Sequence, residues 1–247
     1  MSFNNFRAPV VKLDATPSTN DFLKELAAQN ELENFTAVTA KSQTNGRGQM
    51  GATWHAEAGK NMTMSVFVRN AVQSYGQLPD LSIAVAMSVF DVIAPKVPKA
   101  SVKWPNDIMS DNFKIGGILI ENSLASDEIR SIIGIGINVN QTDFAGLPKA
   151  SSIKIVSGLE YDVDAFAVEL IDSLQLRING LSQSREQLWT EYQSVLFRKG
   201  VPMAFEDQQK RRFMGIITGV AQDGRIEVRL EDDSLQLFGI REIAMLY

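Results

Sequence analysis

A glycine-rich segment, residues 45 to 51 (NGRGQMG), lies between two stretches with the pattern of strands, and this position narrows the possible folds. The phosphate loop of NTPases and the dinucleotide-binding fingerprint both join a strand to a helix, and the phosphate loop also ends in GK[ST]. The segment fits neither. Its glycines let the backbone pass close to a ligand, and Arg47 adds a forked cation suited to phosphate or carboxylate. A surface loop without function is the alternative that the segment alone leaves open.

Apolar periodicity predicts strands and helices over most of the first 196 residues. The expected strands are Val10 to Leu13, Phe35 to Ala40, Met62 to Val68, Ser101 to Trp104, Lys114 to Glu121 and Ile129 to Val139. One helix is expected directly after Ser18. Three more are expected at Pro79 to Ile93, Val163 to Leu181 and Arg185 to Leu196. Ser18 with Asp21 three residues later resembles a helix cap, so capping competes with ligand binding as the role of Ser18 and Thr19.

The pattern changes after Lys199 to short alternating segments punctuated by glycine, which predicts a small β-barrel. We therefore expect two domains, residues 1–196 for ligand binding and catalysis and residues 197–247 for the barrel.

Composition excludes several kinds of chemistry. The chain has 24 Lys and Arg against 29 Asp and Glu, and a net charge of −5 argues against a broad nucleic-acid surface. It has no Cys and a single His, His55, so Ser-His, Cys-His and multi-His metal sites are excluded unless His55 serves alone. No secretory signal and no apolar run of about 18 residues is present, which predicts a cytoplasmic protein without a membrane segment.

Two further segments carry polar residues at the ends of apolar strands. KWPND at 103–107 precedes KIGGILIE at 114–121, where Lys114 opens a core strand and its ammonium is expected to point into a site. A solvated strand end is the alternative for either Lys103 or Lys114. In GIGINVN at 134–140, Asn138 needs a polar partner, which is either a neighbouring turn or the edge of a nucleobase.

Five motifs, taken in order across roughly residues 10 to 145, resemble the biotin protein ligase family. They are Ser18-Thr19-Asn20, Gln43 with Gly46-Arg47-Gly48 and Trp54, KWPND, KIGGILIE and GIGINVN. The resemblance implies a mixed β-sheet flanked by helices, similar to class II synthetases, with a small C-terminal β-barrel. It also implies an ATP-dependent ligase that forms biotinyl-5′-adenylate and transfers biotin to a lysine of a biotin carboxyl carrier protein domain. Mg²⁺ is expected with ATP, and its ligands are unknown.

The resemblance assigns roles to individual residues. Lys114 and Arg47 are the expected catalytic residues. Biotin is expected to contact Ser18, Thr19, Gln43, Gly46, Arg47, Lys114 and Gly117. The nucleotide is expected to contact Arg47, Trp54, Lys103, Asn106, Asp107, Lys114 and Asn138.

Some relatives carry a preceding winged-helix domain, for which this chain leaves no room before residue 18, so we expect no direct DNA binding. Whether an exposed sheet edge serves a homodimer or the acceptor stays open. The competing interpretations are a lipoate protein ligase and a non-catalytic biotin-responsive regulator. Polar Ser18, Thr19 and Gln43 favour a ureido ring over a dithiolane, and Arg47, Lys103 and Lys114 favour an enzyme over a regulator.

Gln49 stands where many family members have a second loop arginine. A neutral side chain cannot hold a phosphate by charge, so we expect looser retention of the adenylate. Gln49→Arg is expected to slow the release of free biotinyl-adenylate, measured by quenching the reaction over time without acceptor. Equal release rates in the two proteins would show that charge at position 49 has no such role.

Overall fold

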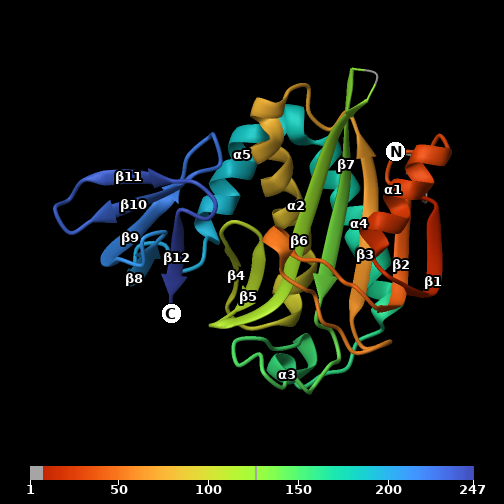
Figure 1. The fold of residues 1–247 in the computed structure, drawn as a ribbon, viewed down its shortest axis with the longest axis horizontal. Coiled ribbons are helices and arrows are strands. Elements are labelled where there is room, and N and C mark those ends of the chain that lie inside the picture. The colour runs from red at the N-terminus through yellow and green to blue at the C-terminus, as the bar shows by residue number, and fades with distance from the viewer. Residues whose placement is uncertain (1–7, 126) are drawn as a thin grey trace.

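The computed structural model describes residues 8–125 and 127–247, and its centre is a seven-stranded mixed sheet in the order β1-β2-β3-β7-β6-β5-β4 (Figure 1). Only β1 and β2 run parallel, and the other neighbours pair antiparallel. The strands are β1 (Val10–Thr16), β2 (Ala37–Gln43), β3 (Met62–Arg69), β4 (Ala100–Lys103), β5 (Asp107–Ser110), β6 (Phe113–Ala125) and β7 (Glu128–Ile137). The predicted mixed sheet flanked by helices is confirmed.

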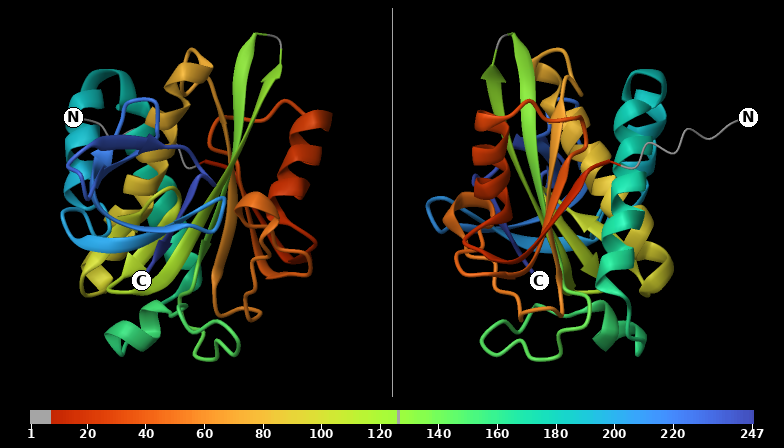
Figure 2. Two further views of the ribbon diagram at one scale, coloured as in Figure 1. Left: turned by 60° about the vertical axis from the view of Figure 1, so that its left-hand side comes forward. Right: turned by 90° about the vertical axis from the view of Figure 1, so that its right-hand side faces the viewer.

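Helices cover both faces of this sheet. The helices are α1 (Thr19–Gln29), α2 (Leu78–Ile93), α3 (Ile153–Ser157), α4 (Val163–Asn179) and α5 (Leu181–Ser194). Figure 2 shows α1 on the opposite side of the sheet from α4. Apolar residues of α2, α4 and α5 join the large core cluster with one face, whereas Leu23 of α1 packs on Val38, Phe67 and Ile132 of the other.

Side chains alternate between these two faces along each strand, because successive residues of a strand point in opposite directions. On β3, Met62, Met64 and Val66 belong to the large core, while Ser65 and Phe67 face α1. The α1 face is therefore partly polar, with Ser65 in contact with Thr19 and Asn20 of α1.

The last five strands form a separate antiparallel sheet in the order β11-β10-β9-β8-β12. They are β8 (Pro202–Asp207), β9 (Arg212–Val220), β10 (Ile226–Leu230), β11 (Leu235–Phe238) and β12 (Ile243–Leu246). The predicted barrel is corrected here, since β11 and β12 stand at opposite edges and do not pair in the described residues. Both edge strands are short, with four residues each. The domain division at residue 197 remains a prediction.

Helix α2 belongs to the interior of the fold. In the described residues, the segment Tyr75–Lys96 is the one helical stretch long and apolar enough to cross a membrane. Its α2 part packs against α4, α5 and the sheet, and eleven of its residues are buried. Its apolar composition is therefore that of a core helix.

A buried carboxylate ties α2 to α5. Asp80 is 5% exposed, and it accepts hydrogen bonds from Trp189 Nε1 (2.7 Å) and Arg185 Nε (2.8 Å). We expect Asp80→Ala to lower the free energy of unfolding by about 2 kcal/mol, because the buried indole N–H loses its partner. Urea unfolding of the variant measures this change. Asp172→Ala, an exposed position on α4, is the control and should change stability little; an equal loss in both variants would contradict the role of Asp80.

Candidate active site

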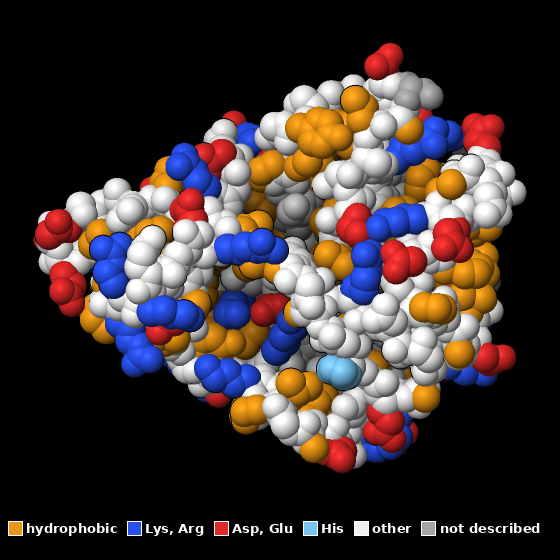
Figure 3. Space-filling model, viewed as in Figure 1, with side chains coloured by type: hydrophobic (Ala, Val, Ile, Leu, Met, Phe, Trp, Pro, Cys, Tyr) orange, Lys and Arg blue, Asp and Glu red, His pale blue; other side chains and the backbone are white. Residues whose placement is uncertain are grey.

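A cavity of about 880 Å³ lies between the α1 face of the large sheet, the glycine-rich loop and the C-terminal sheet. In Figure 3 the surface is hollowed between the C-terminal sheet and the large sheet, and Lys and Arg side chains gather around the hollow. The cations that line it are Arg47, Lys103, Lys114, Lys210 and Arg241. Three carboxylates, Asp107, Glu206 and Asp207, line it as well, so the lining has an excess of positive charge within a chain of negative net charge.

Glycines form the floor of the cavity. Gly117 of β6 pairs directly with Gly136 of β7, and Leu119 pairs with Gly134. A Cβ on Gly136 would lie 2.5 Å from the indole of Trp54, and one on Gly134 would collide with the side chain of Asn20. The absence of side chains at these positions therefore lets both residues approach the sheet backbone.

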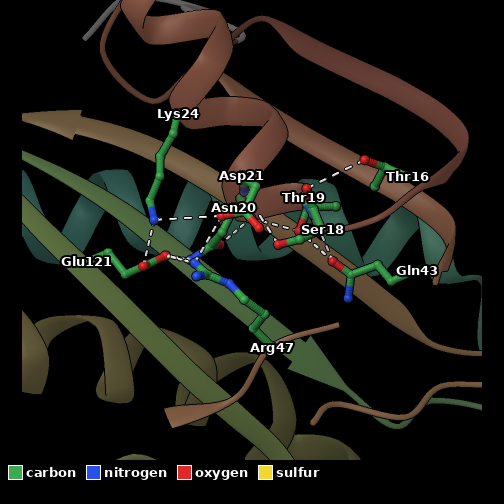
Figure 4. A network of polar contacts seen from close by, with 10 residues as sticks. Thr16, Ser18, Thr19, Asn20, Asp21, Lys24, Gln43, Arg47 and Glu121 are labelled. Carbon is green, nitrogen blue, oxygen red and sulfur yellow. Dashed lines mark hydrogen bonds and ion pairs between the residues drawn. The ribbon is translucent and has the colours of Figure 1, made fainter. Parts of the chain in front are cut away.

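The N-terminus of α1 supplies a polar wall (Figure 4). Ser18 is the N-cap, and its Oγ accepts a hydrogen bond from Asp21 N, so the predicted cap is confirmed. Gln43 Oε1 accepts from the backbone N (2.8 Å) and Oγ1 (3.1 Å) of Thr19. Ser65, fully buried, lies 2.7 Å from Thr19 Oγ1 and donates to Asn20 Oδ1 at 2.5 Å. The carbonyl of Gln43 is therefore used internally, which leaves its amide N–H groups for a ligand.

At another part of the cavity, one carboxylate holds two lysines. Asp107 Oδ1 lies 2.5 Å from Lys114 Nζ, and Oδ2 lies 3.3 Å from Lys103 Nζ. The ammonium of Lys114 also lies 5.9 Å from the centre of the Trp54 ring, and a Cβ on Gly117 would approach its Nζ to 3.2 Å. Two cations share one anion here, which leaves a net positive charge for an incoming acid or phosphate.

The loop arginine is held by two other carboxylates. Arg47 Nη2 lies 2.6 Å from Glu121 Oε2 and 3.1 Å from Asp21 Oδ1. Burial on its own raises the pKa of the Glu121 carboxyl, but hydrogen bonds from Lys24, Asn20 and Arg47 outweigh it and hold the pKa below its usual 4.5. Glu121 is therefore ionised at neutral pH and binds Arg47 as a charged partner.

The structure brings most of the predicted site residues into this one cavity. Its lining includes Ser18, Thr19, Gln43, Arg47, Trp54, Lys103, Asn106, Asp107, Lys114 and Gly117. Gly46 lies just behind the lining, where its position next to Trp54 O and Gln43 Nε2 leaves no room for a Cβ. Asn138 also lies outside the lining: it is 4% exposed, its Nδ2 donates to Ser151 O, and its Oδ1 is buried without a hydrogen-bond partner in the described residues.

Sequence reasoning did not select Ser65, Glu121 or the cations of the C-terminal sheet. Ser65 was detectable as one of two hydroxyl side chains, with Thr63, in the otherwise apolar run of the strand MTMSVFVR. Glu121 ends the KIGGILIE segment, but its contacts with α1 join residues about 100 positions apart. Lys210 and Arg241 reach the cavity only because the second sheet packs beside the first.

A glycine-floored sheet and a cavity rich in cations define a protein that binds a small anionic ligand beside its mixed sheet. The chain belongs to the Biotin/lipoate A/B protein ligase family, whose model matches residues 13–138.

Relatives and solved structures agree with this assignment. A biotin–[acetyl-CoA-carboxylase] ligase of Mycobacterium tuberculosis is 31% identical over 219 residues, covering 85% of this chain and 79% of that protein. A bifunctional ligase/repressor BirA of Bacillus spizizenii is 39% identical over 155 residues, which are 60% of this chain and only 47% of that protein. The structure of an Aquifex aeolicus biotin protein ligase in complex with biotin and ATP has the same fold, with a TM-score of 0.77, 23% identity and coverage of 96% and 98%.

The close contact between Trp54 and the floor is testable. In Gly136→Ala the new methyl group must displace the indole, so we expect a red-shifted tryptophan emission and a lower melting temperature. Gly76→Ala is the matched control, because its Cβ would meet nothing closer than 3.8 Å and it should leave both properties unchanged. An unshifted emission in Gly136→Ala would contradict the packing of Trp54.

Proposed function

We propose that this chain is a biotin protein ligase, which activates the carboxylate of biotin with ATP and transfers the biotinyl group to a lysine of a biotin carboxyl carrier protein domain. The observation that supports it most is that one cavity contains a polar wall, a glycine floor and two tethered groups of cations. The Aquifex aeolicus ligase, which has the same fold, binds biotin and ATP together. For this chain, both substrates are part of the proposal.

The polar wall suits the ureido ring. The carbonyl of a ureido ring accepts hydrogen bonds, and the two N–H groups of the ring donate them. The side chains of Ser18, Thr19 and Gln43 contain both donor and acceptor groups. The glycines at 117 and 136 let Trp54 and Lys114 lie close against the sheet, and a bicyclic ring would bind in the cavity beside them. A dithiolane would gain nothing from these polar groups, so the wall favours biotin over lipoate.

The charged part of the cavity suits the reacting groups. In the first step an oxygen of the biotin carboxylate attacks the α-phosphorus of ATP, the bond to the β-phosphate breaks, and pyrophosphate leaves. Lys114 would contact the carboxylate and the α-phosphate, where its charge offsets the negative charge that accumulates. Asp107 would orient Lys114 and Lys103, and Arg47 would hold the adenylate from the loop.

The nucleotide would lie beside Trp54 and Asn106, as the resemblance implies. Asn138 would meet the adenine: its Oδ1 is buried and unpaired in the described residues, and the exocyclic amine of adenine is a donor that could pair with it. Since Asn138 lies outside the cavity lining, this contact requires movement of the segment around Ser151.

Mg²⁺ would supply charge neutralisation at the phosphates. The described residues contain no group of three or more His, Cys, Asp or Glu that could hold a metal by themselves. Mg²⁺ bound mainly through phosphates and water needs only one or two carboxylates, and Asp107 is the carboxylate beside both lysines. The residues present therefore fit an ion that is bound together with the nucleotide.

In the second step the neutral amine of the acceptor lysine attacks the carbonyl carbon of the adenylate, and AMP leaves. The enzyme supplies no nucleophile of its own, which agrees with a chain that contains no Cys. The glycine-rich loop would cover the adenylate and exclude water, because an adenylate left exposed hydrolyses. The carrier domain as acceptor belongs to this proposal as well.

The central test measures pyrophosphate release with biotin and ATP, followed by transfer of labelled biotin to a carrier domain. Both should occur with biotin and not with lipoate. Pyrophosphate release with lipoate but not with biotin would identify a lipoate protein ligase. No release with either acid would indicate a non-catalytic binding protein.

Lys114→Ala is expected to lower the rate of pyrophosphate release by about 10²-fold, because one preorganised cation at the reacting atoms is lost. Lys154→Ala is the matched control, since Lys154 pairs with Glu160 and does not line the cavity. A near-normal rate in Lys114→Ala would remove this residue from the mechanism.

A further inference from the structure

The glycine-rich loop brings a single cation to the cavity. Residues 41–53 contain only Lys41 and Arg47 as basic residues, and position 49 is a neutral glutamine. Lys41 Nζ pairs with the exposed Asp14 at 2.8 Å and does not line the cavity. Whatever charge the loop contributes to an anionic ligand therefore depends on where Arg47 is held.

Two carboxylates from different elements hold Arg47 at one nitrogen. Glu121, on β6, and Asp21, in the first turn of α1, both contact Nη2. Figure 4 shows Arg47 reaching from the loop to these two side chains. Glu121 is itself fixed, since Asn20 Nδ2 donates to its Oε2 (2.8 Å) and Lys24 Nζ to its Oε1 (2.6 Å).

This arrangement leaves one N–H group of the guanidinium without a hydrogen-bond partner in the described residues. Arg47 Nε is buried and has no hydrogen-bond partner in the described residues, while Arg47 as a whole lines the cavity. A buried N–H without a partner is costly, and a ligand acceptor would remove that cost. Lys24 balances the second carboxylate, so Asp21, Glu121, Lys24 and Arg47 are together neutral and do not repel an anion.

We propose that Glu121, assisted by Asp21, is a positioning residue that holds Arg47 and its loop at the edge of the cavity, where the arginine can contact the activated intermediate. This inference rests on the proposed function for the identity of the ligand. Because the tether uses Nη2 only, the same ion pair persists when the ligand is bound, and its loss weakens retention of the intermediate more than the chemical step.

The first experiment needs no catalysis. Hydrogen–deuterium exchange of residues 44–54 is measured in ligand-free wild type and in Glu121→Gln, which keeps the shape of the side chain and removes its charge. Exchange should become faster in the variant. Glu128→Gln is the matched control on the same β6–β7 hairpin, since Glu128 has a similar exposure (33% against 27%) and pairs with Arg130 instead. Unchanged exchange in Glu121→Gln overturns the proposal.

The second experiment measures escape of biotinyl-adenylate and the kinetic constants. Loss of one charge-assisted contact corresponds to roughly tenfold faster release and a raised KM for biotin, with kcat for pyrophosphate release changed much less. Tighter retention in Glu121→Gln would mean that Glu121 withholds Arg47 from the ligand, and would overturn the proposal.

A double-mutant cycle separates positioning from a structural role. In an Arg47→Ala background, Glu121→Gln should have no further effect on release, because the group that it positions is gone. An equal effect in both backgrounds would show that Glu121 acts by joining α1 to β6. Wild type that forms no adenylate refutes the proposed function, and the exchange measurement then decides the tether by itself.

Discussion

The direct pairing of Gly117 with Gly136 across β6 and β7 is the constraint on which the site depends. Side chains alternate along a strand, so the same strands that place isoleucines in the core also place glycines on the α1 face. Trp54 and Asn20 approach this face more closely than any Cβ would permit. The polar N-terminus of α1 and the end of the glycine-rich loop thus share one floor, and a small acid can be bound between them.

Most cations of the site follow a common pattern in which the side chain is tied to a carboxylate at short range. Asp107 holds Lys103 and Lys114, and Glu121 holds Arg47. A free lysine or arginine on a surface samples many rotamers, and fixing it during binding costs conformational entropy. A tethered cation has already lost that freedom on folding, so its donors are oriented before an anion arrives. Tethering has the disadvantage that each carboxylate lowers the net positive charge of the cavity. The cations that line the cavity outnumber the carboxylates, so a positive charge remains.

The sequence predicted the elements and the members of the site better than their connections. Apolar periodicity identified the strand that carries Lys114 and the strand that ends just before Asn138, and the ordered motifs identified ten residues that line one cavity. The short strands β5, β8 and β12 were not predicted, whereas β4, which also has four residues, was. Strands of this length carry little periodicity, so only some of them can be found from the sequence. The closed barrel was wrong, because whether edge strands pair depends on their length and twist. The contact of Glu121 with Arg47 joins residues 74 positions apart, which no local pattern encodes.

The tether also bears on how a glycine-rich loop can cover a reactive intermediate. Glycines increase the conformational freedom of the unbound loop, so an untethered loop loses much entropy each time it closes. An ion pair at Arg47, in the middle of the segment, divides that freedom between two shorter spans whose ends are fixed, one at β2 and one at Trp54, where the indole packs on the glycine floor. Each span can still open far enough to admit a ligand. The chain lacks the charge of a second loop arginine, and a fixed position for the first reduces the binding energy that ordering the loop would otherwise consume.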